Sequence, residues 1–368
     1  MITLKGQFNH AIVYTDQIDE KAIQQITELC NQEFCRHSII RIMPDVHAGI
    51  GCTIGTTMTL RDKVVPNLVG VDIGCGIEVM KLEENVIDLK NLDQFIRAFI
   101  PAGFNIRKKE HPYVSQIPLH KLRARDHLNM KRARLSVGTL GGGNHFIEVN
   151  EDQTGALYLT IHSGSRHLGK QLAEYYQQRA AEKLAAKPNN KVPRDLAYLE
   201  GQDFEDYIHD MKIVQHYATV NRQAIADEIV RYMNFTVADE FTTIHNYIDT
   251  EHMILRKGAI SAREGERVII PINMRDGSIL AVGKGNPAWN YSAPHGAGRI
   301  LSRRQAKKKI SLQEFKDSMQ NVYSTSVRAA TLDEAPMAYR PLGEILKNIK
   351  DSVEVLEVIK PIYNFKAA

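Results

Sequence analysis

Short glycine-rich segments recur along this chain, and each one carries side chains that can bind a metal ion or an anion. In the run from Pro66 to Ile77, the apolar residues predict a buried strand that ends in a turn at Gly74 and Gly76. Asp72 and Cys75 lie at this junction, where two short side chains can converge on one ion. Alternatively, Asp72 caps the turn and Cys75 is a small buried hydrophobic residue. The recurrence of the pattern elsewhere in the chain favours the metal site.

Length and composition predict a folded globular protein with a sizeable core. The chain has 368 residues, of which 43% are hydrophobic. It contains no internal repeat, no low-complexity tract and no obvious linker, so we expect a single domain over residues 1–368. No stretch approaches the roughly 20 apolar residues of a membrane helix, and no signal-peptide core is present. We therefore expect a cytoplasmic protein that does not use a membrane.

The cysteines are expected to be free thiols. All four, Cys30, Cys35, Cys52 and Cys75, lie in the first quarter of the chain. A disulfide framework is not expected in a reducing compartment, so one of them can serve as a thiolate ligand.

Two further turns carry polar side chains beside glycines. Residues 44–55 contain Asp45, His47 and three glycines, although each of these polar residues, taken singly, is more often a turn-stabilising hydrogen bonder than a catalyst. In residues 138–149, three consecutive glycines precede Asn144, His145 and Glu148. Such a loop can bring backbone N–H groups up to an anion.

Two histidines lie where a large ligand could approach. His162 follows a predicted strand and precedes Ser163, Ser165 and Arg166 at the start of a predicted helix, which indicates a phosphate-binding corner. His295 lies between a proline and small residues, on a loop that a bulky ligand can reach.

The segment 105–135 is strongly basic. It is the best candidate for contact with a nucleic-acid backbone, although such a run is more commonly a solvated face, and the sequence leaves both interpretations open. Its basic residues are Arg107, Lys108, Lys109, Lys121, Arg123, Arg125, Lys131, Arg132 and Arg134.

Helical periodicity predicts a helical insertion over residues 167–233. A basic linker between Pro188 and Pro193 separates two apolar stripes. The second stripe, from Phe204 to Met233, is longer than an average helix, so we expect a helical hairpin or a bent helix there.

Shorter patterns predict the remaining elements. We expect an α/β (α+β) fold in which central mixed β-sheets are flanked by helices, with mixed helices at the end of the chain. The predicted strands lie at 38–43, 77–82, 157–161, 267–270 and 278–282, and further predicted helices lie at 19–35 and 87–100.

Five candidate metal ligands lie in these turns and strand ends: Asp72, Cys75, His145, His162 and His245. One thiolate with three imidazoles favours manganese, iron, cobalt or zinc over magnesium or calcium. Two ions bridged by Cys75 would use all five ligands and leave positions for phosphate oxygens. His245, taken alone, is more simply a core histidine. His295 is then left over, and it is a candidate nucleophile that carries a phosphoryl or nucleotidyl group.

Five segments in this order, Met43–Gly55, Val69–Gly76, Gly138–Val149, His162–Arg166 and His295–Arg299, make the chain similar to the RtcB family of RNA ligases. The similarity extends from about residue 35 to the C-terminus, including residues 256–259 and 336–339. The resemblance implies a GTP- and manganese-dependent ligase that joins an RNA 3′-phosphate or 2′,3′-cyclic phosphate end to a 5′-hydroxyl end. A histidine matching His295 would accept GMP from GTP and pass it to the RNA 3′-phosphate.

The resemblance also implies roles for individual residues. The metal ligands for two manganese ions would be Asp72, Cys75, His145, His162 and His245, with Cys75 bridging. Arg166 and Arg299 match arginines that hold phosphates. The guanylate contacts would be Asn144, His145, Phe146, Ile147, Glu148, His245, Asn246, Pro271, Asn273, Met274, Ser278, His295, Gly296, Ala297, Gly298 and Lys366.

Two departures from the family pattern concern the nucleotide and the RNA. The guanylate loop usually reads Pro-Gly-Ser-Met, where this chain has Ile272 and Asn273 between Pro271 and Met274. The stretch between Pro101 and Gly138 is shorter than in bacterial members that join tRNA halves. The RNA substrate, tRNA or another broken RNA, and the need for an archease-like activator are therefore left open.

Two other functions fit parts of the sequence. A metal-dependent phosphoesterase or RNA cyclic phosphodiesterase without ligation would keep the metals, and the changed loop at Ile272 and Asn273 is its only support. A non-catalytic RNA-binding protein would use the basic segment, but binding alone needs no buried thiolate. The complete ligand set argues against this last function.

Overall fold

A seven-stranded sheet lies at the centre of the computed structural model, which describes residues 1–367. Its strand order is β10-β6-β8-β7-β17-β15-β14, and all neighbouring strands are antiparallel. The strands are β6 (Gly76–Leu82), β7 (Phe146–Glu151), β8 (Leu157–Ser163), β10 (Val237–Ile244), β14 (Arg267–Asn273), β15 (Gly277–Gly283) and β17 (Val353–Lys366).

A second, six-stranded sheet is built mainly from the first part of the chain. Its order is β1-β2-β3-β4-β12-β11, and it is mixed because β2 and β3 are parallel. Its strands are β1 (Ile2–Lys5), β2 (His10–Val13), β3 (Ile40–His47), β4 (Ile54–Thr59), β11 (Asn246–Asp249) and β12 (Ile254–Lys257). Two small sheets pair β13 (Ala259–Ser261) with β16 (Ser292–Pro294), and β5 (Lys63–Val64) with β9 (Leu199–Glu200).

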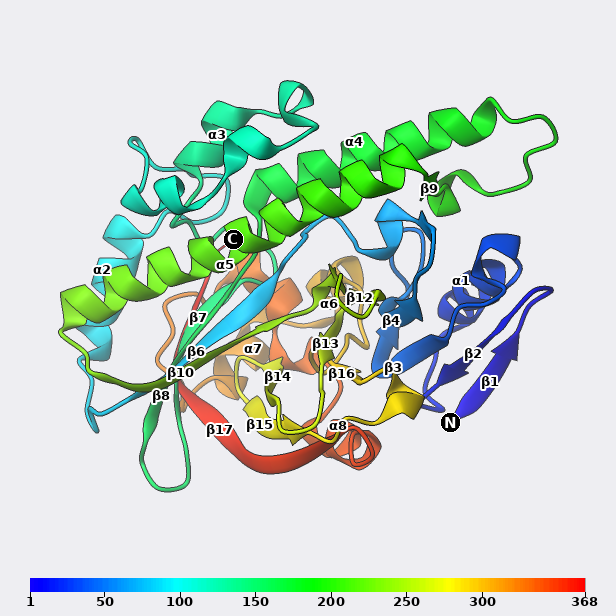
Figure 1. Cartoon of the computed structure of the whole chain (residues 1–368). Coiled ribbons are helices and arrows are strands. Elements are labelled where there is room, and N and C mark those ends of the chain that lie inside the picture. The colour runs from blue at the N-terminus through cyan, green and yellow to red at the C-terminus, as the bar shows by residue number, and fades with distance from the viewer. Residues whose placement is uncertain (368) are drawn as a thin grey trace.

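Two long helices lie side by side across the molecule (Figure 1). They are α4 (Arg166–Ala185) and α5 (Gln202–Met233), and α5 packs on β6 and β8. The shorter helices are α1 (Glu20–Cys30), α2 (Leu89–Phe99), α3 (Met130–Leu135), α6 (Arg303–Lys309), α7 (Leu312–Ser318) and α8 (Leu342–Asn348). Among residues 1–367, no helix combines the length and the apolar character needed to cross a membrane.

The predicted fold class is confirmed, including the mixed sheet and the helical insertion at 167–233. Because α5 is one continuous helix whose buried stripe runs from Tyr207 to Ile229, the predicted hairpin within the second stripe is wrong. That residues 1–368 form a single domain stays a prediction.

One predicted strand is absent from the structure, and one strand was not predicted. The apolar run after Pro66 is a short 3-10 helix followed by turns, and the strand β6 begins only at Gly76. The end of the chain is not only helical, because the fourteen-residue β17 follows α8. The alternation of β-branched and charged residues in Val353–Lys366 is the signal that could have predicted this strand.

Candidate metal centre and active site

The candidate ligands gather at one end of four adjacent strands. Cys75 directly precedes β6, His145 directly precedes β7, His162 lies near the end of β8, and His245 directly follows β10. Because neighbouring strands are antiparallel, the starts of β6 and β7 lie beside the ends of β8 and β10. Residues far apart in the sequence therefore meet at this end of the sheet.

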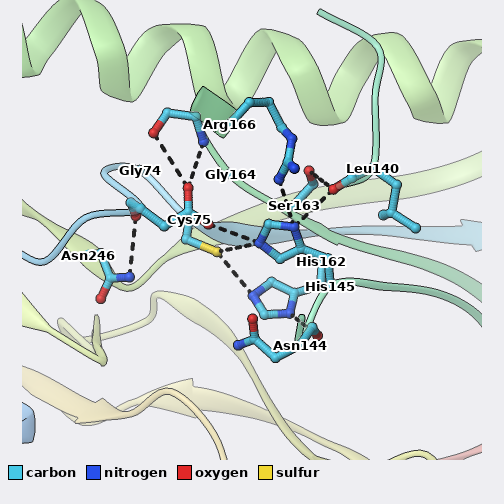
Figure 2. A network of polar contacts seen from close by, with 12 residues as sticks. Gly74, Cys75, Leu140, Asn144, His145, His162, Ser163, Gly164, Arg166 and Asn246 are labelled. Atoms are coloured by element: carbon cyan, nitrogen blue, oxygen red, sulfur yellow. Dashed lines mark hydrogen bonds and ion pairs between the residues drawn. The ribbon is translucent and has the colours of Figure 1, made fainter. Parts of the chain in front are cut away.

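The donor atoms converge on Cys75 (Figure 2). Its Sγ lies 3.4 Å from Nε2 of His145 and 3.3 Å from Nε2 of His162. The Nε2 atoms of His162 and His245 are 3.3 Å apart. The donors form two groups, Cys75-His162-His245 and Asp72-Cys75-His145, and within each group they lie within 4.8 Å of one another. Cys75 belongs to both groups.

Backbone carbonyls orient two of these imidazoles. His145 donates from Nδ1 to the carbonyl of Leu140 at 2.9 Å, and His162 donates from Nδ1 to the carbonyl of Asn144 at 3.1 Å (Figure 2). With the proton on Nδ1, each Nε2 presents a lone pair to the centre, which is the usual arrangement of a metal-binding histidine. The two Nε2 atoms and Sγ of Cys75 then converge on one point, so a shared cation suits the cluster.

Asp72 lies at the edge of the cluster. Its Oδ2 lies 2.9 Å from Nε2 of His145, and its Oδ1 accepts the backbone N–H of Ser165 at 3.0 Å. Gly164 makes this approach possible, because a Cβ there would lie 2.2 Å from Oδ1. Burial opposes ionisation of Asp72, but its contacts with His145 and Arg166 hold the pKa of its carboxyl below the ordinary value.

Burial controls the protonation of the other donors. It lowers the pKa of His162 and of His245 well below the ordinary value, and neighbouring imidazoles add to the effect. Burial, and then the charge of Asp72, raises the pKa of the Cys75 thiol. A divalent cation would reverse this effect at the thiol, since a coordinating thiol is deprotonated. The donor set of one sulfur, three imidazoles and a carboxylate fits borderline-soft divalent ions.

His295 lies beside this cluster and is held by a buried carboxylate. Its ring centroid is 4.8 Å from that of His245, and its Nδ1 lies 2.7 Å from Oδ2 of Asp45. Asp45 is fully buried in β3. The sequence interpretation did not pair these two residues, which are 250 positions apart. A hydrogen bond from Nδ1–H to Asp45 leaves Nε2 of His295 as the basic nitrogen.

Most of the predicted site residues surround one cavity of about 310 Å³. This volume lies at the lower end of the range for small-ligand pockets, roughly 300–1,000 Å³. The predicted residues that line it are Asp72, Cys75, Asn144, Phe146, Glu148, His162, His245, Asn246, Pro271, Asn273, Met274, His295, Gly296, Ala297, Gly298, Arg299 and Lys366.

Four predicted site residues do not line this cavity. His145 is buried behind Cys75, and Ile147, a residue of β7, packs in the hydrophobic core. Ser278 is buried in β15, and its hydroxyl makes no hydrogen bond within residues 1–367. Arg166 has Nη1 at 2.9 Å from Nδ1 of His145, so its guanidinium lies behind a candidate ligand.

A carboxylate that the sequence interpretation missed organises the basic side of the cavity. Glu334 accepts from Nζ of Lys366 at 2.7 Å and from the hydroxyl of Tyr339 at 2.7 Å. It also forms ion pairs with Arg299 at 3.3 Å and Arg303 at 3.2 Å. Burial opposes its ionisation, but Lys366 and Arg303 keep its pKa below the ordinary value. The basic groups that face the cavity are therefore paired with one carboxylate.

A second buried carboxyl, Glu148, lies in the wall of the cavity. Burial raises its pKa to about 7, although hydrogen bonding by Asn364 and the charge of Lys366 oppose this shift. Nδ2 of Asn364 donates to Oε1 of Glu148 at 2.6 Å. This carboxyl changes its charge near neutral pH.

The loop that departs from the family pattern is internally bonded. Ile272 is buried in a hydrophobic cluster, and the amide of Asn273 donates to Oδ2 of Asp276 at 2.8 Å. Oδ1 of Asn273 accepts the backbone N–H groups of Arg275 and Asp276. Asn273 therefore shapes this turn while also lining the cavity.

Comparison with known proteins identifies the family. The family model described as "tRNA-splicing ligase RtcB" matches residues 25–121 and 115–367. The chain is 32% identical to the RNA-splicing ligase RtcB of Escherichia coli strain K12, over 94% of both chains. It is 26% identical to the tRNA-splicing ligase RtcB of Aeropyrum pernix, over 91% of this chain and 90% of that one. This chain therefore belongs to the RtcB family.

Proposed function

We propose that this protein is a GTP- and manganese-dependent RNA ligase, which joins an RNA 3′-phosphate or 2′,3′-cyclic phosphate end to a 5′-hydroxyl end. The observation that carries the proposal is the pairing of His295 with Asp45 beside His245, one of the candidate metal ligands. Relatives over nearly the whole chain are named RNA-splicing and tRNA-splicing ligases, which supports RNA as the substrate.

The first step is guanylylation of His295. Its Nε2 attacks the α-phosphorus of GTP, so that an N–P bond forms and the bond to pyrophosphate breaks. Asp45 keeps the proton on Nδ1 and stabilises the positive charge that develops on the ring. The carboxylate holds the ring in one orientation, which places Nε2 toward the cavity.

Two transfers complete the reaction. An oxygen of the RNA 3′-phosphate attacks the phosphorus on His295, which breaks the N–P bond and leaves GMP on the RNA end. The 5′-hydroxyl of the second RNA then attacks the 3′-phosphate, and GMP leaves. Arg299 and Lys366 line the cavity and supply positive charge for these phosphates.

Asp72, Cys75, His145, His162 and His245 would hold two manganese ions. When bound, the ions would withdraw negative charge from phosphate oxygens. Cys75 belongs to both donor groups, which supports its role as the bridging ligand.

Glu148 and Asn246 are proposed guanine or ribose contacts. Both line the cavity, and Glu148 is a buried acceptor. Guanine carries N–H donors on N1 and N2, which a carboxylate can accept together. The remaining predicted guanylate contacts keep this role as part of the proposal.

Incubation with α-labelled GTP and manganese tests the proposal. Wild-type protein should retain an acid-labile label and should join two RNAs that carry the stated ends. His295→Ala should lose the label completely, and Asp45→Asn should reduce its rate of formation by roughly 10²- to 10⁴-fold. The assay is run with and without an archease-like activator, because the sequence leaves the need for one open.

A single result would exclude ligation. If the wild-type protein opens a 2′,3′-cyclic phosphate but never takes up label from GTP, with or without the activator, the protein is a phosphodiesterase. The loop at Ile272 and Asn273 would then be the first place to look for the loss of nucleotide binding.

A further inference from the structure

Phe104 is an aromatic side chain left in solvent. It is 93% exposed, the highest value among the large hydrophobic residues of the described chain. A ring in this position loses the stabilisation that burial would give it, since fully burying a Phe side chain is worth about 1.5–3 kcal/mol. The ring is therefore available to a ligand.

The loop that carries Phe104 is bonded to the edge of the active site. The backbone N–H of Gly103 donates to the carbonyl of Gly141 at 2.8 Å, and Ala102 forms a β-bridge with Gly141. Leu140, the preceding residue, donates its backbone N–H to the carbonyl of Pro101, and its own carbonyl accepts from His145, a candidate metal ligand. These hydrogen bonds fix the backbone of the Phe104 loop relative to the metal centre.

The loop that is bonded to the Phe104 loop continues to the cavity. Gly143 and Asn144 follow Gly141, both are exposed, and Asn144 lines the cavity. The guanidinium of Arg166 lies against Gly141, and that of Arg303 lies against Gly143. A polyanion that leaves the cavity over Gly143 and Asn144 therefore passes Arg303.

The surface next to Phe104 is basic. Nη2 of Arg132 donates to the carbonyl of Phe104 at 3.1 Å, which holds a guanidinium at the backbone of this residue. Lys108 and Lys109 follow on the same loop, are exposed, and form no ion pair with any of residues 1–367. By contrast, Arg107, Arg123 and Arg134 of the same basic segment are paired with Glu228, Asp206 and Glu110. The basic residues of the segment without an ion-pair partner among residues 1–367 thus include Lys108 and Lys109, which follow Phe104 closely in sequence.

We propose that Phe104 is a stacking platform for a base of the RNA substrate, with Arg132 and the adjacent lysines binding the neighbouring phosphates. The inference rests on the proposed RNA ligation and names where an RNA strand runs outside the cavity. An aromatic ring beside cationic side chains is the usual design of sites for single-stranded nucleic acid, because every base has a face that can stack.

A protein partner fits this surface less well. Protein interfaces bury contiguous apolar area, whereas Phe104 is followed by Asn105 and, after two further residues, by two exposed lysines. One isolated ring with free lysines is complementary to a base and its phosphates.

The test uses 2-aminopurine, a fluorescent base that is quenched by stacking, at successive positions near the ligated ends of single-stranded RNA. One position should be quenched on binding to wild-type protein and to Phe104→Trp, but not on binding to Phe104→Ala. Phe104→Ala should also bind the RNA about 5- to 100-fold more weakly, the range of one lost base stack. Arg132→Ala should lower the dependence of binding on salt concentration by about one counterion.

Val86→Ala is the matched control. Val86 is 87% exposed and follows β6 at the end of the strand opposite to Cys75, so its loss should leave both RNA affinity and quenching unchanged. Guanylylation of His295 requires no RNA and is measured on the same samples.

The outcomes separate the two proposals. If wild-type protein fails to take up label from GTP, the proposed function is wrong. If it takes up label, and Phe104→Ala binds RNA with unchanged affinity and unchanged quenching, the stacking platform is wrong. Weaker binding by Phe104→Ala that Phe104→Trp does not restore would also contradict stacking.

Discussion

The two sides of the cavity handle charge in opposite ways. On the metal side, Sγ of Cys75 lies 3.3–3.4 Å from Nε2 of His145 and of His162, so these donor atoms can share a cation. On the nucleotide side, Lys366 and Arg299 already have a carboxylate partner in Glu334. A bound cation would supply the positive charge that the donor atoms of the metal side can share. On the second side, ion pairs with Glu334 hold the basic groups in place, and under the proposed function a phosphate would compete with Glu334 for them.

The two sides also differ in how they are supported. The metal side is built on the ends of β6, β7, β8 and β10, whose backbone hydrogen bonds fix the ligands. The nucleotide side, meaning Arg299, Arg303, Glu334, Tyr339 and Lys366, comes from loops and short helices of the last third of the chain and from the end of β17. Glu148, a proposed guanine contact, lies in β7 and belongs to neither group. Substitutions on the first side should therefore affect metal binding, whereas those on the second should affect nucleotide binding.

The largest expected effect is that of Cys75→Ala. Loss of the shared donor should abolish guanylylation and lower the number of manganese ions bound per chain, measured by elemental analysis after dialysis. Cys30→Ala is the control, since Cys30 is also a buried free thiol but lies in α1, away from the cluster. Full manganese content in Cys75→Ala would show that the thiol is not a ligand.

A smaller effect is expected for Lys366→Met. This change should raise the KM for GTP by roughly 10- to 100-fold, since a charge-assisted hydrogen bond is worth about 1.5–3 kcal/mol. Manganese content should not change. Glu334 would lose one partner but keep Arg299 and Tyr339, so the loss of stability should be below the 3–5 kcal/mol typical of a broken buried pair.

The double variant Lys366→Met, Glu334→Gln sharpens this test. If Lys366 only neutralises Glu334, the double variant should recover GTP use. If Lys366 binds the nucleotide, GTP use should stay weak while thermal stability recovers. Loss of manganese in Lys366→Met would remove the distinction between the two sides.

The smallest expected effect is the pH dependence that Glu148 gives to the free energy of unfolding. Its pKa is about 7 in the folded protein and near 4.5 in the unfolded chain, so the folded state holds the proton more tightly. The contribution of this group to stability is therefore present below pH 4.5 and lost as the pH rises through 7, by about 3 kcal/mol at most. Glu148→Gln should remove this fall in the free energy of unfolding, which is measured by urea denaturation at pH 5 and pH 8.

GTP binding should show the opposite dependence on pH. If the ionised carboxylate of Glu148 accepts from guanine, wild-type affinity for GTP should rise between pH 6 and pH 8. The affinity of Glu148→Gln should be lower and should vary less over this range. An equal rise in GTP affinity in the wild type and in Glu148→Gln would show that another group causes the pH dependence.

The sequence was sufficient to place the candidate ligands in turns and strand ends, because glycines and short polar residues mark such places locally. It was not sufficient to pair Asp45 with His295, since this contact depends on how β3 packs against the loop after β16. Glu334 was missed for the same reason. Its partners Arg299 and Lys366 lie 35 and 32 residues away, and no local pattern links them.

The secondary-structure errors have local causes. The residues after Pro66 are apolar because they are buried against α4, and burial alone does not distinguish a strand from a turn. In α5, packing along the whole buried stripe supports a helix far longer than the average.

The long strand β17 has a consequence for how the protein is made. Residues 353–359 pair with β15, and residues 360–366 pair with β7, so the backbone pairing of the sheet passes from one half to the other through this strand. The ribosome synthesises these residues after all the candidate ligands and after His295. A nascent chain therefore cannot complete this sheet, or the cavity that Lys366 lines, until translation has passed this strand.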